Sequence, residues 1–319
     1  MRRLTRALVL VLIGIIFGCL AGEGLVRLGT ANQKNYVIEI WRYTGLLMRP
    51  AADPAVGHEH VPGASARLQG VEISINRLGL RGPEPVPGRP AVVLAGDSMA
   101  LGWGVDEADT LAAGLARRLG DDVQVLNAGI GNMTMPQIIA HWLMIRQRIG
   151  DDFPIRALIL MPSSRAGLPP SSGKAGWLLR NSALAALVST FHARLTSGDV
   201  GRDGMIAAYR EAWTGPAGVA RIAGAFDRLA TEARADDMRV IVAQLPDTND
   251  FRDYDFGFMA RTTGGEAAAR GWDFVDLYPL FAGEDAAAFQ AMPGDVHLNA
   301  AAYDRIADRL APLLATPAS

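Results

Sequence analysis

Cysteine, excess charge and cofactor-binding motifs are all scarce in this sequence. The 319 residues include one cysteine, Cys19, so no disulfide can form within the chain. A formal net charge of -2 argues against a nucleic-acid-binding protein. The sequence has no glycine-rich phosphate loop, no zinc-type spacing of Cys and His and no basic patch interleaved with aromatics. We therefore expect no cofactor, no metal and no nucleic-acid partner.

One long apolar run is present, and it lies at the N-terminus. Arg2, Arg3 and Arg6 precede an uncharged stretch over residues 7–22. A positively charged start followed by an apolar run is typical of export signals and membrane anchors. Only one charged residue interrupts residues 8–26, so a membrane-spanning helix of about 20 residues fits there.

Three interpretations of this segment remain open. We favour an uncleaved signal anchor over residues 1–30, which places one transmembrane helix in the inner membrane and the rest of the chain in the periplasm. The alternatives are a signal peptide cut after Ala21 and a lipoprotein modified at Cys19.

Residues 31–89 are predicted to be an extended lead-in segment, because proline and glycine are frequent from residue 50 onward. Within it, residues 32–49 are compatible with a short helix near the membrane, and residues 71–75 alternate like a strand. His58 and His60 have the spacing of a metal pair, but the surrounding Gly and Pro favour a solvated loop.

From residue 90 onward, short apolar runs alternate with helical patterns. Continuous apolar runs suit parallel strands that are buried on both faces. The expected strands cover residues 92–95, 123–126, 157–161, 239–245 and 274–277, and the expected helices cover 110–119, 136–149, 219–234, 265–270 and 300–314. This order predicts one α/β domain over residues 90–316, with a five-stranded parallel sheet and helices on both faces. An insertion at about 163–216 is either a lid beside the site or a surface helix packed on the core.

Polar side chains follow each expected strand. Ser98 follows the first, residues 127–132 the second, Ser163 and Ser164 the third, Asp247 the fourth, and Asp295 and His297 come after the fifth. Because the carboxyl ends of parallel strands meet at one edge, these residues are expected to lie together. A serine needs a base to take its proton, and a histidine base needs a group that orients it. The sequence therefore predicts a catalytic triad of Ser98, His297 and Asp295.

Three neighbouring residues have expected supporting roles. We expect Asp97 to hydrogen bond within its own turn, Asn299 to cap the last helix, and Trp103 to line the pocket.

Three segments resemble conserved blocks of the SGNH hydrolases, also called GDSL esterases. These segments are Gly96-Asp-Ser98, Asn127-Ala-Gly-Ile-Gly131 and Asp295-Val-His297. The resemblance implies a flavodoxin-like three-layer α/β/α fold and hydrolysis of esters, often on carbohydrates or lipids. It also implies an oxyanion hole formed by the backbone of Ser98 and by Gly131, with Gly129 as the near alternative.

Two departures from the family pattern affect the expected chemistry. The third block of the family has an Asn that donates to the oxyanion, whereas Ser164 occupies that position here. We expect Ser164, Asn132 or Arg165 to replace it, or the activity to be weak. The second departure is the two-residue spacing of Asp295 and His297, which resembles the branch that acetylates exported polysaccharides.

The resulting prediction is a serine-dependent ester hydrolase that acts on an acylated small molecule or glycan in the cell envelope. An O-acetyltransferase of an exported polysaccharide is the first alternative, because the same triad serves both reactions. A non-catalytic protein that binds a glycan or a partner is the second. The sequence gives no indication of the oligomeric state.

Overall fold

The computed structural model describes residues 2–170, 176–197 and 201–315. Its centre is a parallel sheet with the strand order β6-β5-β7-β8-β9. The five strands are β5 (Ala91–Gly96), β6 (Gln124–Gly129), β7 (Ile155–Met161), β8 (Arg239–Gln244) and β9 (Asp273–Asp276). This is the flavodoxin-like order, in which the chain reverses direction across the sheet between the first and third strands. The predicted five-stranded parallel sheet is confirmed.

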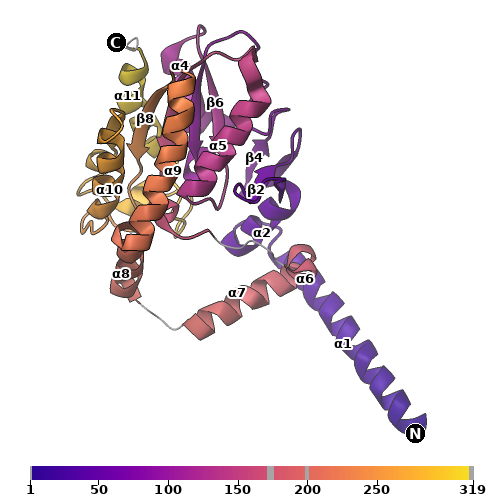
Figure 1. Ribbon diagram of the computed structural model, residues 1–319. Helices are drawn as coiled ribbons and strands as arrows, with labels where there is room; N and C mark the ends of the chain where they lie inside the picture. The colour runs from indigo at the N-terminus through magenta and orange to yellow at the C-terminus, as the bar shows by residue number, and fades with distance from the viewer. Residues whose placement is uncertain (1, 171–175, 198–200, 316–319) are drawn as a thin grey trace.

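Two apolar cores lie on opposite faces of the sheet. Alternate residues of β5 divide between them, with Val93 and Ala95 in one core and Val92 and Leu94 in the other. Helices α5 (Met135–Ile149), α9 (Pro216–Ala235) and α10 (Gly257–Ala268) cover the first face, and α4 (Leu111–Leu119) and α11 (Ala300–Ala315) cover the second. The molecule therefore has the expected three layers (Figure 1).

Local capping explains where several helices begin. Thr110 Oγ1 accepts the Ala113 N–H at the start of α4, and Asn299 Oδ1 accepts the Ala302 N–H at the start of α11, as expected for Asn299. Helix α9 begins at Pro216, earlier than predicted, because proline is well suited to the first helical position.

The lead-in segment is more ordered than an extended chain. It forms α2 (Tyr36–Leu46) and two antiparallel hairpins, β1 (Met48–Pro50) with β2 (His58–His60) and β3 (Ser65–Leu68) with β4 (Val71–Ser74). Tyr43, Leu47 and Ile73 form a third small core with Leu101 and Trp103. The lead-in is thus packed beside the loop that follows β5.

The prediction of a solvated loop around His58 and His60 is wrong. His60 is almost fully buried, and its Nδ1 lies 3.2 Å from the Gly79 carbonyl oxygen. His58 Nε2 lies 2.8 Å from the carbonyl oxygen of Gly131. Both imidazoles have hydrogen-bond partners within the protein, which allows the segment to pack against the domain.

The insertion after β7 is helical. It contains α6 (Trp177–Asn181), α7 (Ala183–Ser197) and α8 (Gly201–Thr214). Helix α8 packs on α9 and α10, whereas α6 and α7 pack on the N-terminal helices (Figure 1).

Helix α1 (Arg2–Gly29) projects away from the α/β domain (Figure 1). The segment Arg3–Gly29 is long and apolar enough to cross a membrane or to serve as a signal sequence. None of its most apolar stretch is buried in the protein. This helix agrees with the predicted N-terminal segment.

Candidate active site

Ser98 lies at the turn between β5 and the short helix α3 (Ser98–Leu101). A Cβ at Gly96 would lie 2.6 Å from the Cβ of Ala100 and 2.8 Å from the Met161 carbonyl oxygen. Only glycine therefore allows the chain to turn this sharply beside β7. The turn places the serine at the carboxyl end of β5, an interior strand of the sheet.

Asp97 holds this turn in place, as expected. Its Oδ1 accepts the Met99 N–H at 3.0 Å, and its Oδ2 accepts a hydrogen bond from Ser163 Oγ. Burial raises the pKa of this carboxyl group, although the hydrogen bonds from Ser163 and Met99 oppose the shift. Asp97 thus links the loop after β5 to the loop after β7.

The structure brings Ser98, His297 and Asp295 into one hydrogen-bonded line. Ser98 Oγ lies 2.7 Å from His297 Nε2, and His297 Nδ1 lies 2.6 Å from Asp295 Oδ1. Asp295 Oδ1 also accepts the His297 backbone N–H at 3.1 Å. These distances suit a nucleophile, a base and an orienting carboxylate, in that order.

The environment of Asp295 favours its ionised form. Burial alone raises the pKa of the carboxyl group, but hydrogen bonds and the charge of His297, together with a hydrogen bond from Gln69, outweigh it and lower the pKa. An ionised Asp295 accepts the Nδ1–H of His297. That tautomer leaves Nε2 as the acceptor for the Ser98 hydroxyl.

Gln69 is a site residue that the sequence analysis missed. It lies in the two-residue turn between β3 and β4, and its Nε2 donates to Asp295 Oδ2 at 3.0 Å. Gln69 and Gly70 have φ values of 50° and 83°, as the turn of a tight hairpin requires. The sequence signals at most a hairpin here, because the partner of Gln69 is 226 residues away.

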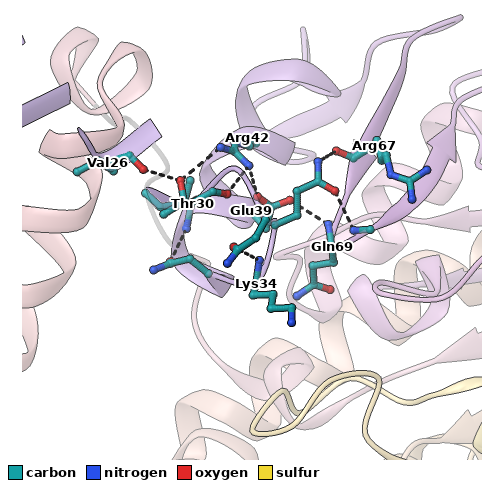
Figure 2. A network of polar contacts seen from close by, with 12 residues as sticks. Val26, Thr30, Lys34, Glu39, Arg42, Arg67 and Gln69 are labelled. Atoms are coloured by element: carbon teal, nitrogen blue, oxygen red, sulfur yellow. Dashed lines mark hydrogen bonds and ion pairs between the residues drawn. The ribbon is translucent and has the colours of Figure 1, made fainter. Parts of the chain in front are cut away.

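A buried polar network connects Gln69 to the end of α1 (Figure 2). Glu39 is fully buried; its Oε2 accepts the Gln69 backbone N–H at 2.9 Å, and its Oε1 accepts from Arg42 Nη1 at 2.5 Å. Arg42 also donates to the carbonyl oxygen of Thr30 at 3.2 Å. The backbone of Gln69, whose side chain supports Asp295, is therefore held by the segment that follows α1.

The N–H of Gly131, an expected oxyanion donor, is already engaged. It donates to Tyr43 Oη at 3.0 Å, and Tyr43 Oη lies 2.7 Å from His60 Nε2. Burial lowers the pKa of His60 to about 4, so the imidazole is neutral and Nε2 accepts from the tyrosine. Gly131 is needed here for space, since a Cβ would lie 2.7 Å from Tyr43 Cε1.

Ser98 and Asn132 have backbone N–H groups in the loops that follow β5 and β6. The Ile130 N–H donates to the Gly96 carbonyl oxygen at 3.2 Å, which sets the loops after β5 and β6 side by side. Asn132 has a φ of 65°, an uncommon conformation for a residue other than glycine. Within the described part of the chain, no group accepts a hydrogen bond from the Asn132 or Ser98 backbone N–H.

Ser164 and Arg165 follow β7, as predicted, but the surroundings of Ser164 differ from those of Arg165. The Ser164 side chain interacts with the Tyr209 hydroxyl, and its carbonyl oxygen accepts from Trp213 Nε1 at 2.8 Å. The Arg165 guanidinium acts electrostatically on Asp97, and its Nε is buried with no hydrogen-bond partner among the described residues. Arg165 thus places a positive charge near the loop that follows β5.

Two aromatic rings flank His297. The Trp103 ring centroid lies 6.3 Å from that of His297, but Trp103 is fully buried, so it packs behind the imidazole and does not line an open pocket as expected. The Tyr36 centroid lies 6.0 Å away, and Tyr36 is 42% exposed. Burial raises the pKa of Tyr36 to about 12, so its hydroxyl stays protonated.

Comparison with known proteins gives similarity in structure only. No family model matches the chain, and no curated protein matches it. Similar solved structures include a carbohydrate acetylesterase family member from Sinorhizobium meliloti (14% identity, 70% of this chain, 97% of that chain, TM-score 0.42). A lipolytic G-D-S-L family protein from Veillonella parvula is 14% identical, with 70% of this chain and 97% of that chain covered and a TM-score of 0.45. The M. smegmatis aryl esterase is also 14% identical, with 70% of this chain and 98% of that chain covered and a TM-score of 0.43.

The Veillonella protein bears the name of the family that the sequence motifs resemble. At these identities and TM-scores, the likeness carries no conclusion about activity. The case for a function therefore rests on the geometry of the site.

Proposed function

We propose that this chain is a serine-dependent ester hydrolase whose catalytic residues are Ser98, His297 and Asp295. The observation that carries the proposal is the hydrogen-bonded line from Ser98 Oγ through the imidazole to the Asp295 carboxylate, with distances of 2.7 and 2.6 Å. His297 Nε2 takes the Ser98 proton while Oγ attacks the acyl carbonyl carbon. The protonated imidazole then gives that proton to the leaving alcohol.

The second half of the reaction releases the acyl group. Water attacks the ester formed on Ser98 while His297 accepts a proton from that water. The imidazolium then returns this proton to Ser98 Oγ as the bond between Oγ and the acyl carbon breaks. Free acid and the original serine remain. General-base assistance of this kind contributes about 10²–10⁴-fold to the rate.

The oxyanion is stabilised in this proposal by the backbone N–H groups of Ser98 and Asn132. Asn132 takes the role expected of Gly131, because the Gly131 N–H donates to Tyr43. Arg165 is the third donor in place of the missing Asn, because its Nε is buried without a hydrogen-bond partner among the described residues. Ser164 is not assigned this role, because its side chain interacts with the Tyr209 hydroxyl. Such donors act where charge develops in the transition state.

Gln69 is a positioning residue in the same scheme. Its amide donates to the Asp295 oxygen that His297 does not use, so both carboxylate oxygens are bound. This fixes the rotation of the carboxylate and therefore the direction of the imidazole.

The proposed location is the periplasmic face of the inner membrane. Arg2, Arg3 and Arg6 precede the apolar helix α1, and positive residues favour the cytoplasmic side of a span. The rest of the chain then faces the envelope, where acylated carbohydrates or lipids are available as substrates.

The test is labelling of the full-length protein by a fluorophosphonate probe, together with hydrolysis of p-nitrophenyl acetate. Wild type should label and hydrolyse, and Ser98→Ala should do neither. Ser74→Ala, which removes an exposed hydroxyl on β4, is the matched control and should behave as wild type. Labelling or hydrolysis retained in Ser98→Ala refutes the proposal. A chain that never labels is a binding protein instead.

O-acetyl transfer to an envelope glycan is the second candidate, favoured by the two-residue spacing of Asp295 and His297. It differs only in the acceptor, a sugar hydroxyl in place of water. An acetyl donor supplied with an oligosaccharide separates the two activities. Acetylated sugar identifies a transferase, and free acetate alone identifies a hydrolase.

A further inference from the structure

The α6–α7 segment presents an apolar face that no described part of the protein covers. Trp177 and Leu178 of α6 are 72% and 60% exposed, and Val188, Phe191 and Leu195 of α7 are 56%, 63% and 69% exposed. The last three are spaced three and four residues apart, so they share one side of the helix. Contiguous exposed side chains of this size mark an interaction surface.

Two polar residues among the exposed positions of α7 lie on a different side from this apolar face. Ser189 and Thr196 are exposed, and helical geometry turns both about 100° or more from the direction of Phe191. The helix is therefore amphipathic, with apolar side chains on one face and hydroxyl groups on another. Helices of this type lie in the interfacial plane of a bilayer.

The start of α7 is fixed to α1 through Glu23. The Glu23 carboxylate accepts the backbone N–H groups of Ala183 and Leu184 at 3.0 and 2.9 Å and the Ser182 hydroxyl at 2.8 Å. An acidic group on the free N–H groups of a helix start stabilises that helix. Helix α6 is held as well, because Trp41 Nε1 donates to the Leu179 carbonyl oxygen at 2.9 Å.

Glu23 also sets the height of α7 relative to a membrane. It is the first charged residue after the apolar stretch of residues 7–22 in the helix that is long enough to span. A hydrocarbon core takes about 20 helical residues, so Glu23 lies at its boundary with the headgroups. Figure 1 shows α7 leaving α1 sideways at this end rather than running along it.

We propose that α6–α7 is a second membrane contact, which lies in the bilayer surface with Val188, Phe191 and Leu195 among the acyl chains. The lipid bilayer is the occupant because the apolar face continues from the exposed apolar surface of α1. Helix α2, which carries Tyr36 beside His297, packs on α7. The contact therefore holds the candidate active site close to the membrane surface.

Spin labels on the full-length chain in phosphatidylglycerol-containing nanodiscs test this contact. Cys19→Ser removes the one native thiol, and labels are then attached at Phe191→Cys and, as the matched control on the polar side, at Ser189→Cys. Leu195→Cys gives a second position on the apolar face. Accessibility to oxygen, which concentrates in lipid, is compared with accessibility to a water-soluble nickel chelate.

The expected result is high oxygen and low nickel accessibility at positions 191 and 195, with the reverse at 189. Equal nickel accessibility at all three positions overturns the proposal, because the apolar face would then lie in water. Protection of 191 and 195 from both reagents also overturns it, because a protein partner would then cover the face. Neither outcome depends on ester hydrolysis.

Discussion

The side-chain amide of Gln69 lies 3.0 Å from Oδ2 of Asp295 and joins a hairpin of the lead-in segment to the loop before the last helix. Residues outside the α/β domain thereby contribute to the candidate active site. Glu39 and Arg42 extend this support to Thr30, the residue after α1 (Figure 2).

Gln69→Leu should reduce kcat/KM for p-nitrophenyl acetate by about 10- to 100-fold, since a hydrogen bond to a charged group contributes about 1.5–3 kcal/mol. Loss of that bond also raises the pKa of Asp295, so activity should be lost at a higher pH on acidification. The measurement is a pH–rate profile. Gln33→Leu is the control, because Gln33 bonds the same hairpin through Arg67 and Gly70 without touching Asp295. A profile unchanged by Gln69→Leu would show that the bond does not position the carboxylate.

Asp295→Asn should lower kcat by about 10³–10⁴-fold, because an amide no longer favours the His297 tautomer that accepts the Ser98 proton. Fluorophosphonate labelling of Ser98 should slow in parallel. The matched control is Asp304→Asn on the surface of α11, where the carboxylate pairs with Arg118. Retention of full activity by Asp295→Asn would remove Asp295 from the catalytic scheme.

Asn132→Gly should keep kcat within about twofold, because the proposed donor is the backbone N–H and glycine adopts the same positive φ readily. If the amide side chain were the donor instead, kcat would fall by about 10²–10³-fold. Steady-state kinetics on the purified variant distinguish the two, with a thermal melt to verify folding.

Arg165→Leu should lower kcat by about 10²–10³-fold with little change in KM, because the guanidinium is proposed to act on the oxyanion of the transition state. Arg156→Leu, an exposed arginine of the preceding strand, is the control. A rise in KM at constant kcat would instead assign Arg165 to binding of the ground-state substrate.

The free energy of unfolding should fall as pH drops from about 6.5 toward 4, by up to about 3 kcal/mol from His60 alone. The folded-state pKa of His60 is about 4 because the imidazole is buried, so in this pH window the unfolded state binds more protons. His60→Gln should flatten the dependence, since Gln also has one acceptor and one donor for Tyr43 and Gly79. His192→Gln, on the exposed part of α7, should leave it unchanged. Denaturant titrations at several pH values check this.

Much of the α/β domain follows from local pattern. The apolar run of residues 91–95 predicts a doubly buried strand, and the structure places it in the interior of the sheet between β6 and β7. Because all carboxyl ends of parallel strands meet at one edge, the order Ser98, Asp295, His297 was enough to predict that the three lie together. The turn role of Asp97 and the capping role of Asn299 were predictable from local spacing, since Met99 and Ala302 lie only two and three residues away.

The remaining features depend on contacts between distant segments, which leave no periodicity in the sequence. Tyr43 lies 88 residues from Gly131 in the sequence and accepts the Gly131 N–H that was expected in the oxyanion hole. Gln69 lies 226 residues from Asp295, to which its side chain donates. The burial of His60 likewise depends on how the lead-in packs on the domain. The sequence alone thus determined the sheet and the order of the reactive groups, through side-chain polarity and turn chemistry. Only the tertiary structure decided which donors are free and what holds the carboxylate, because those depend on the packing of the lead-in against the catalytic edge.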